Sequence, residues 1–208
     1  MKLTTFVVGL SMAATLTHAS VVFDNGGPNQ LSGNEMTAWI QAQSFSLATT
    51  DTVQAVQFWA LDAGGSYTGS ITYSIYNNNA GVPGVLMASG TASPVEVATG
   101  LTVLDTYTEE LLAFNLASGF TATGGTTYWL GLHNGPPSTT SRLNFYWEDT
   151  SGGLGLAPQE FAAGALVWDS NTSQHAFQLF DTSVPEPGAF GIMGLGLALV
   201  GFNRLRRR

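Results

Sequence analysis

SITYSIY, residues Ser70–Tyr76, decides the fold class because its polar and apolar residues alternate without a break. In a β-strand, Ile71, Tyr73 and Ile75 would share one face, and the serines and threonine between them would share the other. Residues 77–84 hold three asparagines, two glycines and a proline, which predict a long turn. The stretch therefore predicts a half-buried strand followed by a reversal of the chain.

Similar short apolar segments recur between glycine-rich turns along most of the chain. We expect strands at residues 21–23, 37–47, 52–61, 70–76, 85–92, 110–117, 126–133, 142–147, 166–168 and 174–180. No segment keeps a helical period, and 25 glycines interrupt the sequence. The pattern predicts an all-β body over residues 20–183. We expect this body to be a single antiparallel β-sandwich, jelly-roll-like, whose first and last strands are candidates to pair.

The N-terminus has the features of a secretory signal peptide. Met1-Lys2 precedes an apolar stretch from Leu3 to Leu16, and Thr17-His18-Ala19 provides small residues for cleavage. We expect residues 1–19 to form a signal helix that the secretion machinery exports and that signal peptidase removes between Ala19 and Ser20.

The C-terminus has three parts within residues 184–208. Pro185 and Pro187 bracket Glu186 and would keep that backbone extended and accessible to a protease. Residues 188–202 carry no charge and would span roughly 22 Å as a helix, less than a hydrocarbon core of about 30 Å. We therefore expect a weak hydrophobic anchor that holds the protein in the inner membrane transiently.

Two groups of residues define this anchor and its orientation. The apolar anchor residues are Ala189, Phe190, Ile192, Leu195, Leu197, Leu199, Val200 and Phe202. The basic tail consists of Arg204, Arg206, Arg207 and Arg208, which would stay on the cytoplasmic side of the membrane.

The combination of Pro185-Glu186-Pro187, the apolar segment and the arginine tail resembles the PEP-CTERM sorting signal of Gram-negative, biofilm-forming bacteria. The resemblance implies that an exosortase cuts near this motif and passes the exported protein to the cell surface or the extracellular space. The alternative is an ordinary C-terminal anchor. Phrases in the body at residues 23–27, 75–84, 127–135 and 175–180 resemble uncharacterised PEP-CTERM surface proteins. That second resemblance implies secretion and a β fold, without an activity.

The charge of the body limits its partners. Of the 14 acidic residues only Glu186 lies beyond residue 183, and of the six Lys and Arg residues only Arg142 lies within the body. Nucleic acid is therefore excluded as a partner, because its phosphates require several basic side chains. The chain has no cysteine, so the exported fold must be stabilised by its core rather than by disulfides.

Five tryptophans, Trp39, Trp59, Trp129, Trp147 and Trp168, lie in or near the expected strands. Each would most simply fill the core, although an exposed ring can stack on a sugar. Trp147 next to Glu148 is the pair best suited to contact a glycan, since carboxylates bind sugar hydroxyls. His133 and His175 lack metal-ligand spacing and are interpreted as structural.

Neither a catalytic site nor a definite metal site is indicated. Glu148 and its acidic neighbour would point to opposite faces of a strand, and the chain has neither a GxSxG motif nor a cysteine nucleophile. Calcium is a possible ligand, because Asp24, Asn25, Glu35 and Asp181 would lie near strand ends that converge if the terminal strands pair. No other cofactor is expected.

The sequence thus predicts a non-enzymatic structural or adhesive protein of the cell surface or extracellular matrix, linked to exopolysaccharide and biofilm. Two alternatives stay open. One is a module that binds exopolysaccharide through an exposed tryptophan, and the other is a hydrolase whose catalytic carboxylates are dispersed in the sequence.

Overall fold

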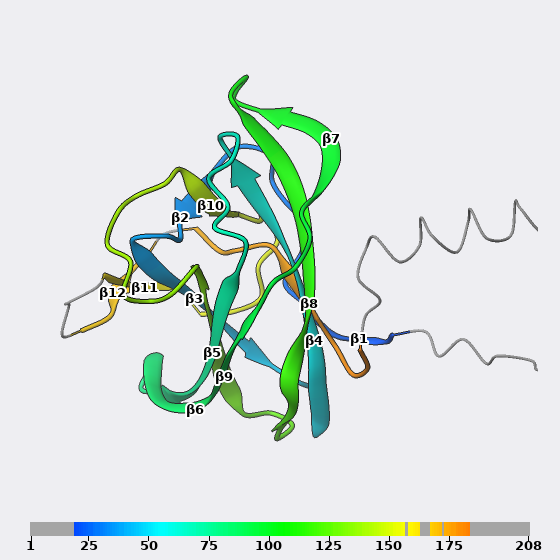
Figure 1. Ribbon diagram of the computed structural model, residues 1–208. Helices are drawn as coiled ribbons and strands as arrows, with labels where there is room; N and C mark the ends of the chain where they lie inside the picture. Colours follow the sequence, from blue (N-terminus) through cyan, green and yellow to red (C-terminus); the bar gives the residue numbers. More distant parts are fainter. Residues whose placement is uncertain (1–18, 157, 163–166, 172, 184–208) are drawn as a thin grey trace, which may run out of the picture.

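A computed structural model describes residues 19–156, 158–162, 167–171 and 173–183, and these residues form strands and loops without a helix (Figure 1). The two expected hydrophobic helices lie outside this part of the chain. Within the described ranges, no helix combines the length and the hydropathy that a membrane crossing would require.

The first sheet contains seven strands, all paired antiparallel. They are β1 (Val21–Asp24), β2 (Gly33–Glu35), β4 (Asp51–Asp62), β7 (Val97–Val103), β8 (Tyr107–Ala122), β10 (Phe145–Glu148) and β13 (Phe177–Phe180). One edge of β4 pairs with β8, which in turn pairs with β7. The other edge pairs first with β13 and then with β10, and these two strands carry β1 and β2.

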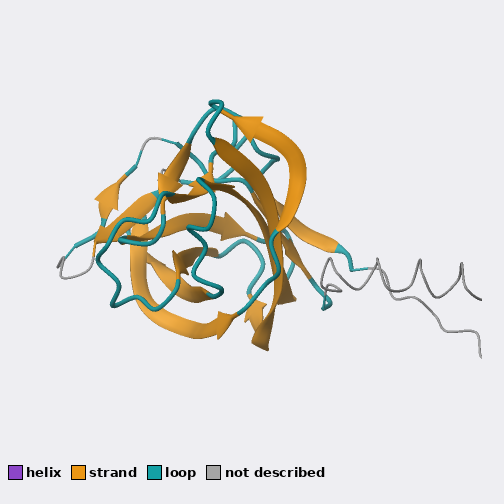
Figure 2. Cartoon of the chain, turned by 45° about the horizontal axis from the view of Figure 1, so that its top comes forward, coloured by secondary structure: helices purple, strands orange, loops and turns teal. Residues whose placement is uncertain are grey.

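The second sheet contains six antiparallel strands in the order β12-β11-β3-β9-β5-β6. They are β3 (Trp39–Ser46), β5 (Ile71–Asn79), β6 (Val82–Ala92), β9 (Thr127–Asn134), β11 (Gln159–Ala162) and β12 (Asp169–Ser170). Figure 2 shows how strongly the strands of the protein curve around its interior.

One hydrophobic core joins the two sheets. Tyr73 of the second sheet stacks on Phe114 of the first, with ring centroids 5.6 Å apart. Tyr128 of the second sheet meets Phe120 of the first edge-on at 5.1 Å. The all-β, antiparallel two-sheet expectation is therefore confirmed, while the jelly-roll variant stays a prediction. The pairing expected for the first and last strands is also confirmed, by β1 and β13.

The prediction of a long turn at residues 77–84 is wrong. β5 continues through Asn79, and the reversal occurs at Ala80 and Gly81, which both have positive φ. The asparagines serve the hairpin instead of breaking it. Asn77 Oδ1 accepts a hydrogen bond from the Val85 N–H at 2.6 Å, where the β5–β6 ladder has an irregular register. Asn78 Oδ1 accepts from the Gly81 N–H at 3.2 Å and from Trp129 Nε1 at 3.0 Å.

Four strands were not predicted, or not predicted correctly, from the sequence pattern. β2 lies partly in an expected loop, β7 and β11 were not expected, and the strand expected at residues 166–168 is replaced by β12 at Asp169–Ser170. Val167 and Trp168 lie outside any strand. β7 is exposed along most of its length, so hydrogen bonds to β8 define it rather than a buried apolar face.

Replacing Phe114 with alanine should lower the free energy of unfolding by about 3–5 kcal/mol, because the ring bridges the sheets and the change leaves a cavity. Urea denaturation of the full chain measures this loss. Leu154→Ala is the matched control, since Leu154 is 76% exposed, and it should cost about 0.5 kcal/mol or less. Equal losses for the two variants would contradict the assigned core.

Candidate functional site

Trp147 lies in the core, so its predicted contact with a glycan is wrong for this fold. Its exposed fraction is 0%, and its indole N–H donates to the Ala176 carbonyl at 3.0 Å. The ring of His175 stacks on it with centroids 4.6 Å apart. Since Trp147 points inward from β10, neighbouring Glu148 points to the opposite face of the sheet.

Glu148 forms a buried carboxyl pair with Glu109 of β8. Glu148 Oε1 accepts a hydrogen bond from the Gln30 N–H at 2.8 Å, and the two carboxyl groups contact each other. Neither Glu148 Oε2 nor Glu109 Oε2 has a donor partner among the described residues. The nearby Glu109 carboxyl group favours the protonated form of Glu148, because two neighbouring carboxylates would repel each other.

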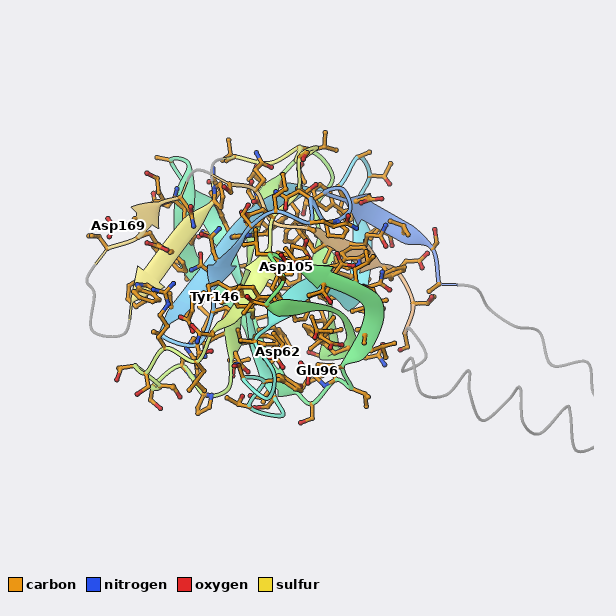
Figure 3. All side chains as sticks on the ribbon, turned by 90° about the horizontal axis from the view of Figure 1, so that it is seen from above. Asp62, Glu96, Asp105, Tyr146 and Asp169 are labelled. Atoms are coloured by element: carbon orange, nitrogen blue, oxygen red, sulfur yellow. The ribbon has the colours of Figure 1, made fainter. Side chains whose placement is uncertain are left out.

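Burial, followed by the charges of Glu109 and Asp149, raises the pKa of Glu148 from 4.5 to about 8, although the hydrogen bond from the Gln30 N–H opposes the shift. A second carboxyl group behaves similarly. Burial, followed by the charges of Asp62 and Glu110, raises the pKa of Glu96 to about 7. Asp62 and Glu96 lie close together in the structure (Figure 3). The body therefore keeps some of its carboxyl groups protonated near neutral pH.

His175 and Asp149 are buried next to each other, with His175 Nδ1 3.3 Å from Asp149 Oδ1. The other carboxylate oxygen, Asp149 Oδ2, accepts from the Ser32 hydroxyl at 2.7 Å. The aspartate thus lies between the serine and the histidine. A nucleophilic serine needs the histidine next to its hydroxyl, so this group does not have the geometry of a catalytic triad.

His133 is also buried, and its Nδ1 lies 3.1 Å from the Gly135 carbonyl oxygen. Burial lowers the pKa of His133, while hydrogen bonds to the backbone and the charge of Glu35 act in the opposite direction. Both histidines of the body therefore occupy enclosed positions within the fold, as their interpretation as structural residues required.

The four residues considered for calcium do not come together. Asp24 and Asp181 belong to opposite ends of the β1–β13 pair, and Glu35 lies across the sheet in β2. Each uses its oxygen atoms within the chain: Asp24 accepts from the Gly26 N–H, Asn25 from the Leu154 N–H, Glu35 from the Thr37 and Ala38 N–H groups, and Asp181 from the Ser20 N–H. Across the described ranges, no group of three or more Asp, Glu or His side chains is placed to hold a metal.

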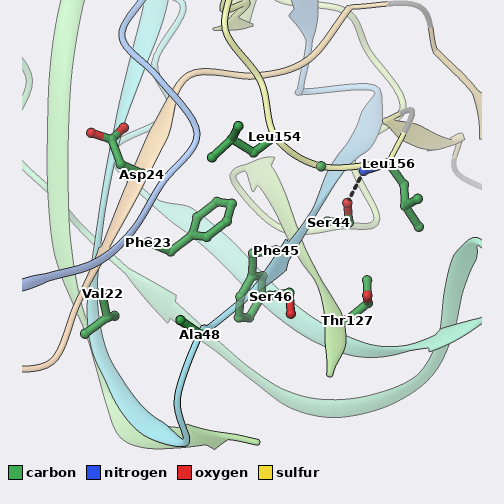
Figure 4. Close-up of a pocket in the computed structure, with 11 residues that line it drawn as sticks. Val22, Phe23, Asp24, Ser44, Phe45, Ser46, Ala48, Thr127, Leu154 and Leu156 are labelled. Atoms are coloured by element: carbon green, nitrogen blue, oxygen red, sulfur yellow. Dashed lines mark hydrogen bonds between the residues drawn. The ribbon is translucent and has the colours of Figure 1, made fainter. Parts of the chain in front are cut away.

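An open groove of about 460 Å³ lies between β1, the end of β3 and the loop around residue 155 (Figure 4). Its lining is mainly apolar and small polar: Val22, Phe23, Asp24, Ser44, Phe45, Ser46, Ala48, Thr127, Leu154, Gly155 and Leu156. Asp24 is the one charged residue of this lining, and its second oxygen accepts from Gln178 Nε2 at 2.9 Å. The groove thus offers apolar contact without a pair of carboxylates.

Three tryptophans, Trp39, Trp59 and Trp168, are only partly buried. Trp168 belongs to an aromatic cluster with Tyr76 at 5.5 Å and Phe161 at 5.3 Å between ring centroids. Trp39 lies under the Arg142 guanidinium, whose central carbon is 5.6 Å from the ring centroid. Sequence reasoning did not single out these two surfaces. The one available signal was Arg142 itself, the only basic side chain of the body other than histidine.

The buried carboxyl groups predict a stability that decreases as the pH rises. Because the folded-state pKa of Glu148 is about 8 and that of Glu96 about 7, against 4.5 ordinarily, the folded protein binds more protons than the unfolded chain between these values. Their contribution is therefore complete below about pH 4.5 and is lost as the pH rises through 7 and 8. We expect the melting temperature to fall from pH 5 to pH 9.

Glu148→Gln removes the titrating group while keeping a similar volume. Its melting temperature should therefore decrease less between pH 5 and pH 9 than that of the wild-type chain, as measured by circular dichroism at both values. Asp105→Asn, on an exposed turn, serves as the control and should follow the wild-type profile. Parallel profiles for Glu148→Gln and the wild type would show that Glu148 does not titrate in this range.

Comparison with protein families identifies a match at the C-terminus: the model of the PEP-CTERM protein-sorting motif matches residues 183–208. No curated protein matches the chain. The matched range contains Pro185, Glu186, Pro187, the apolar anchor residues and the arginine tail, all of which lie outside the residues that the structure describes. The motif implies export and exosortase-dependent sorting to the cell surface. This chain therefore carries a PEP-CTERM protein-sorting motif behind a β-rich body.

Proposed function

We propose that the protein is an exported component of the cell surface or extracellular matrix of a Gram-negative bacterium, with a structural or adhesive role linked to exopolysaccharide and biofilm. The match of the sorting motif to residues 183–208 carries this proposal. In this scheme residues 1–19 direct export, residues 20–183 are the functional body, and residues 184–208 are removed or exchanged at the inner membrane by an exosortase.

The position of the motif supports this division. The last strand ends at Phe180, and every residue of the described hydrophobic core precedes it or coincides with it. A cut near Pro185-Glu186-Pro187 would therefore remove no core residue. Residues 185–187 act here as the substrate of a processing enzyme rather than as an active site.

The body itself is proposed to be non-enzymatic. The contacting pair Glu109 and Glu148 is buried, with exposed fractions of 2% and 0%, so a substrate has no access to it. Asp149 and His175 are likewise buried and contact each other. Hydrolysis of a glycosidic bond needs two carboxyl groups that flank the substrate, and these enclosed groups do not provide them.

The sorting proposal predicts a change of mass that depends on the exosortase. In a host with exosortase, the protein should be recovered in a shorter form at the surface or outside the cell. In an otherwise identical host without the enzyme, it should keep residues 184–208 and remain with the inner membrane. Intact-mass spectrometry of fractionated cells measures both. A single membrane-bound form of unchanged mass in both hosts would identify an ordinary anchor.

Replacing all three residues of Pro185-Glu186-Pro187 with alanine should block processing in the competent host, since the extended acidic motif is lost. The matched control replaces Val184 and Gly188, which flank the motif, and should be processed. Processing of the triple variant at the normal rate would show that the enzyme recognises another part of the chain.

We further propose that calcium is not needed for the fold, because the oxygen atoms of Asp24, Asn25, Glu35 and Asp181 are bonded to groups of the chain itself. Melting temperatures measured in about 1 mM calcium and in excess chelator should then agree. This concentration is about the dissociation constant of the weaker extracellular calcium sites. A rise of several degrees with calcium would reveal a site that these residues or others form.

The second candidate function is the binding of exopolysaccharide. The partly exposed tryptophans favour it, because an aromatic ring at the surface can stack on the apolar face of a sugar. Trp39 and Trp168 are the residues concerned, in place of buried Trp147.

A further inference from the structure

The Arg142 guanidinium lies between two aromatic rings at the protein surface. Its central carbon is 5.6 Å from the ring centroid of Trp39 and 5.8 Å from that of Tyr146. Tyr146 in turn meets Tyr107 edge-on, with centroids 5.4 Å apart. Arg142 is itself exposed, and Trp39 and Tyr146 are partly exposed. Cation–π contacts with the two rings restrict the position of the guanidinium.

Arg142 has no acidic partner among the described residues. The one salt-bridge contact found there is between His175 and Asp149, although the body carries 13 acidic side chains for its one arginine. Glu35 approaches this segment but accepts from the Leu143 N–H at 3.3 Å and from two further backbone N–H groups. In such an acidic protein an arginine side chain would be expected to pair with a carboxylate. The contact of Arg142 with aromatic rings instead of a carboxylate therefore indicates another role.

A depression of about 210 Å³ opens beside Tyr146. Its lining is aromatic, apolar and polar: Leu31, Ser32, Gly33, Leu61, Leu104, Tyr107 and Tyr146. Leu31 and Leu104 are 67% and 65% exposed and enlarge the apolar surface around the tyrosines. Aromatic and apolar walls next to a fixed guanidinium suit a ligand that has both an apolar face and an anionic group.

We propose that Trp39, Arg142 and Tyr146 form a binding site for a uronic-acid residue of an acidic heteropolysaccharide. The Arg142 guanidinium donates two parallel N–H···O bonds to the sugar carboxylate, which is the geometry that arginine favours. The sugar ring stacks on the exposed part of an aromatic ring, and the adjoining sugar occupies the depression lined by Tyr107. This inference rests on the second candidate function and is independent of the sorting proposal.

The charge of the body restricts the ligand further. With thirteen acidic side chains and one arginine, the body repels densely charged polymers such as nucleic acid, which need several basic side chains. A heteropolysaccharide in which one uronate occurs among neutral sugars brings a single carboxylate to the single arginine. Screening at about 0.15 M salt, where the Debye length is about 8 Å, removes most of the remaining long-range repulsion.

The test uses a xylo-oligosaccharide that carries one glucuronic acid, and the same oligosaccharide after its carboxyl group has been reduced to an alcohol. Binding to the full chain is measured by calorimetry and tryptophan fluorescence at about 0.15 M salt. The full chain includes the apolar segment 188–202 and is therefore kept in detergent. A polyoxyethylene detergent is used, because a detergent with a sugar headgroup would compete for the site. We expect the acidic oligosaccharide to bind about tenfold or more tightly than the reduced one, since charge-assisted hydrogen bonds are lost on reduction.

Three variants assign the site. Arg142→Gln should weaken binding of the acidic oligosaccharide about tenfold or more, and Arg142→Lys, which keeps the charge without the planar fork, should weaken it less. Trp39→Ala should also weaken it. Trp59→Ala is the matched control, because Trp59 is also a partly buried tryptophan but lies in β4 outside this group, and it should bind like the wild type.

Melting temperatures of all variants separate a binding role from a structural one. Unchanged binding by Arg142→Gln, equal affinity for the two oligosaccharides, or no binding by the wild-type chain would each overturn the proposal. A large decrease in the melting temperature of Arg142→Gln, without binding by the wild type, would show that Arg142 stabilises the loop before β10 instead of binding a ligand. None of these outcomes affects the exosortase experiment, whose readout is the mass of the chain.

Discussion

The fold depends on the hydrogen bonding of β4. This strand pairs with β8 along one edge and with both β13 and β10 along the other. Among the described residues, β13 is the last strand, and it carries the first strand, β1, on its outer side. The two ends of the body are therefore held by the same central strand, and the first sheet is complete only when residues 177–180 have been added. Such long-range antiparallel pairing makes the body one cooperative unit rather than a set of independent hairpins.

Sequence reasoning found the elements whose side chains alternate between core and surface. Ile71, Tyr73 and Ile75 face the core because burial selects for that alternation, and the strand was predicted on that basis alone. β7 has no buried face, so its sequence does not show the alternation of polar and apolar residues that would predict a strand. The run of asparagines from Asn77 to Asn79 was misleading for a different reason. Asparagine favours turns because it bonds to nearby backbone, and here it forms such bonds within the bulged hairpin itself.

The same limits apply to the sites. The sorting motif could be predicted because all its parts are contiguous in the sequence, and the match to the family model confirms it. Trp147 and Glu148 were paired because they are adjacent, yet adjacent residues of a strand face opposite ways, and the structure places the ring in the core. The Trp39–Arg142–Tyr146 group could not be predicted. Trp39 begins β3 and Arg142 belongs to the loop before β10, and only the folded chain brings them together.

The acidic character of the body also has a structural consequence. A body with one arginine has few cations to pair with its buried carboxyl groups, which are stabilised in two other ways. Glu35 is stabilised by backbone N–H groups, while burial and the charge of Glu109 raise the pKa of Glu148 and favour its neutral form. The single arginine is therefore not needed to stabilise the interior, and this frees it for the surface position between Trp39 and Tyr146.

The geometry of the two ends agrees with processing on one side of the molecule. Ser20 and Asp181 exchange hydrogen bonds: the Ser20 N–H donates to Asp181 Oδ1 at 2.9 Å, and the Asp181 N–H donates to the Ser20 carbonyl at 3.1 Å. The expected signal peptide, residues 1–19, and the segment matched by the sorting motif, residues 183–208, are thus attached to the body at neighbouring points. Because β1 and β13 are already paired at these points, cleavage on either side would separate a targeting segment from the body without breaking a strand pair.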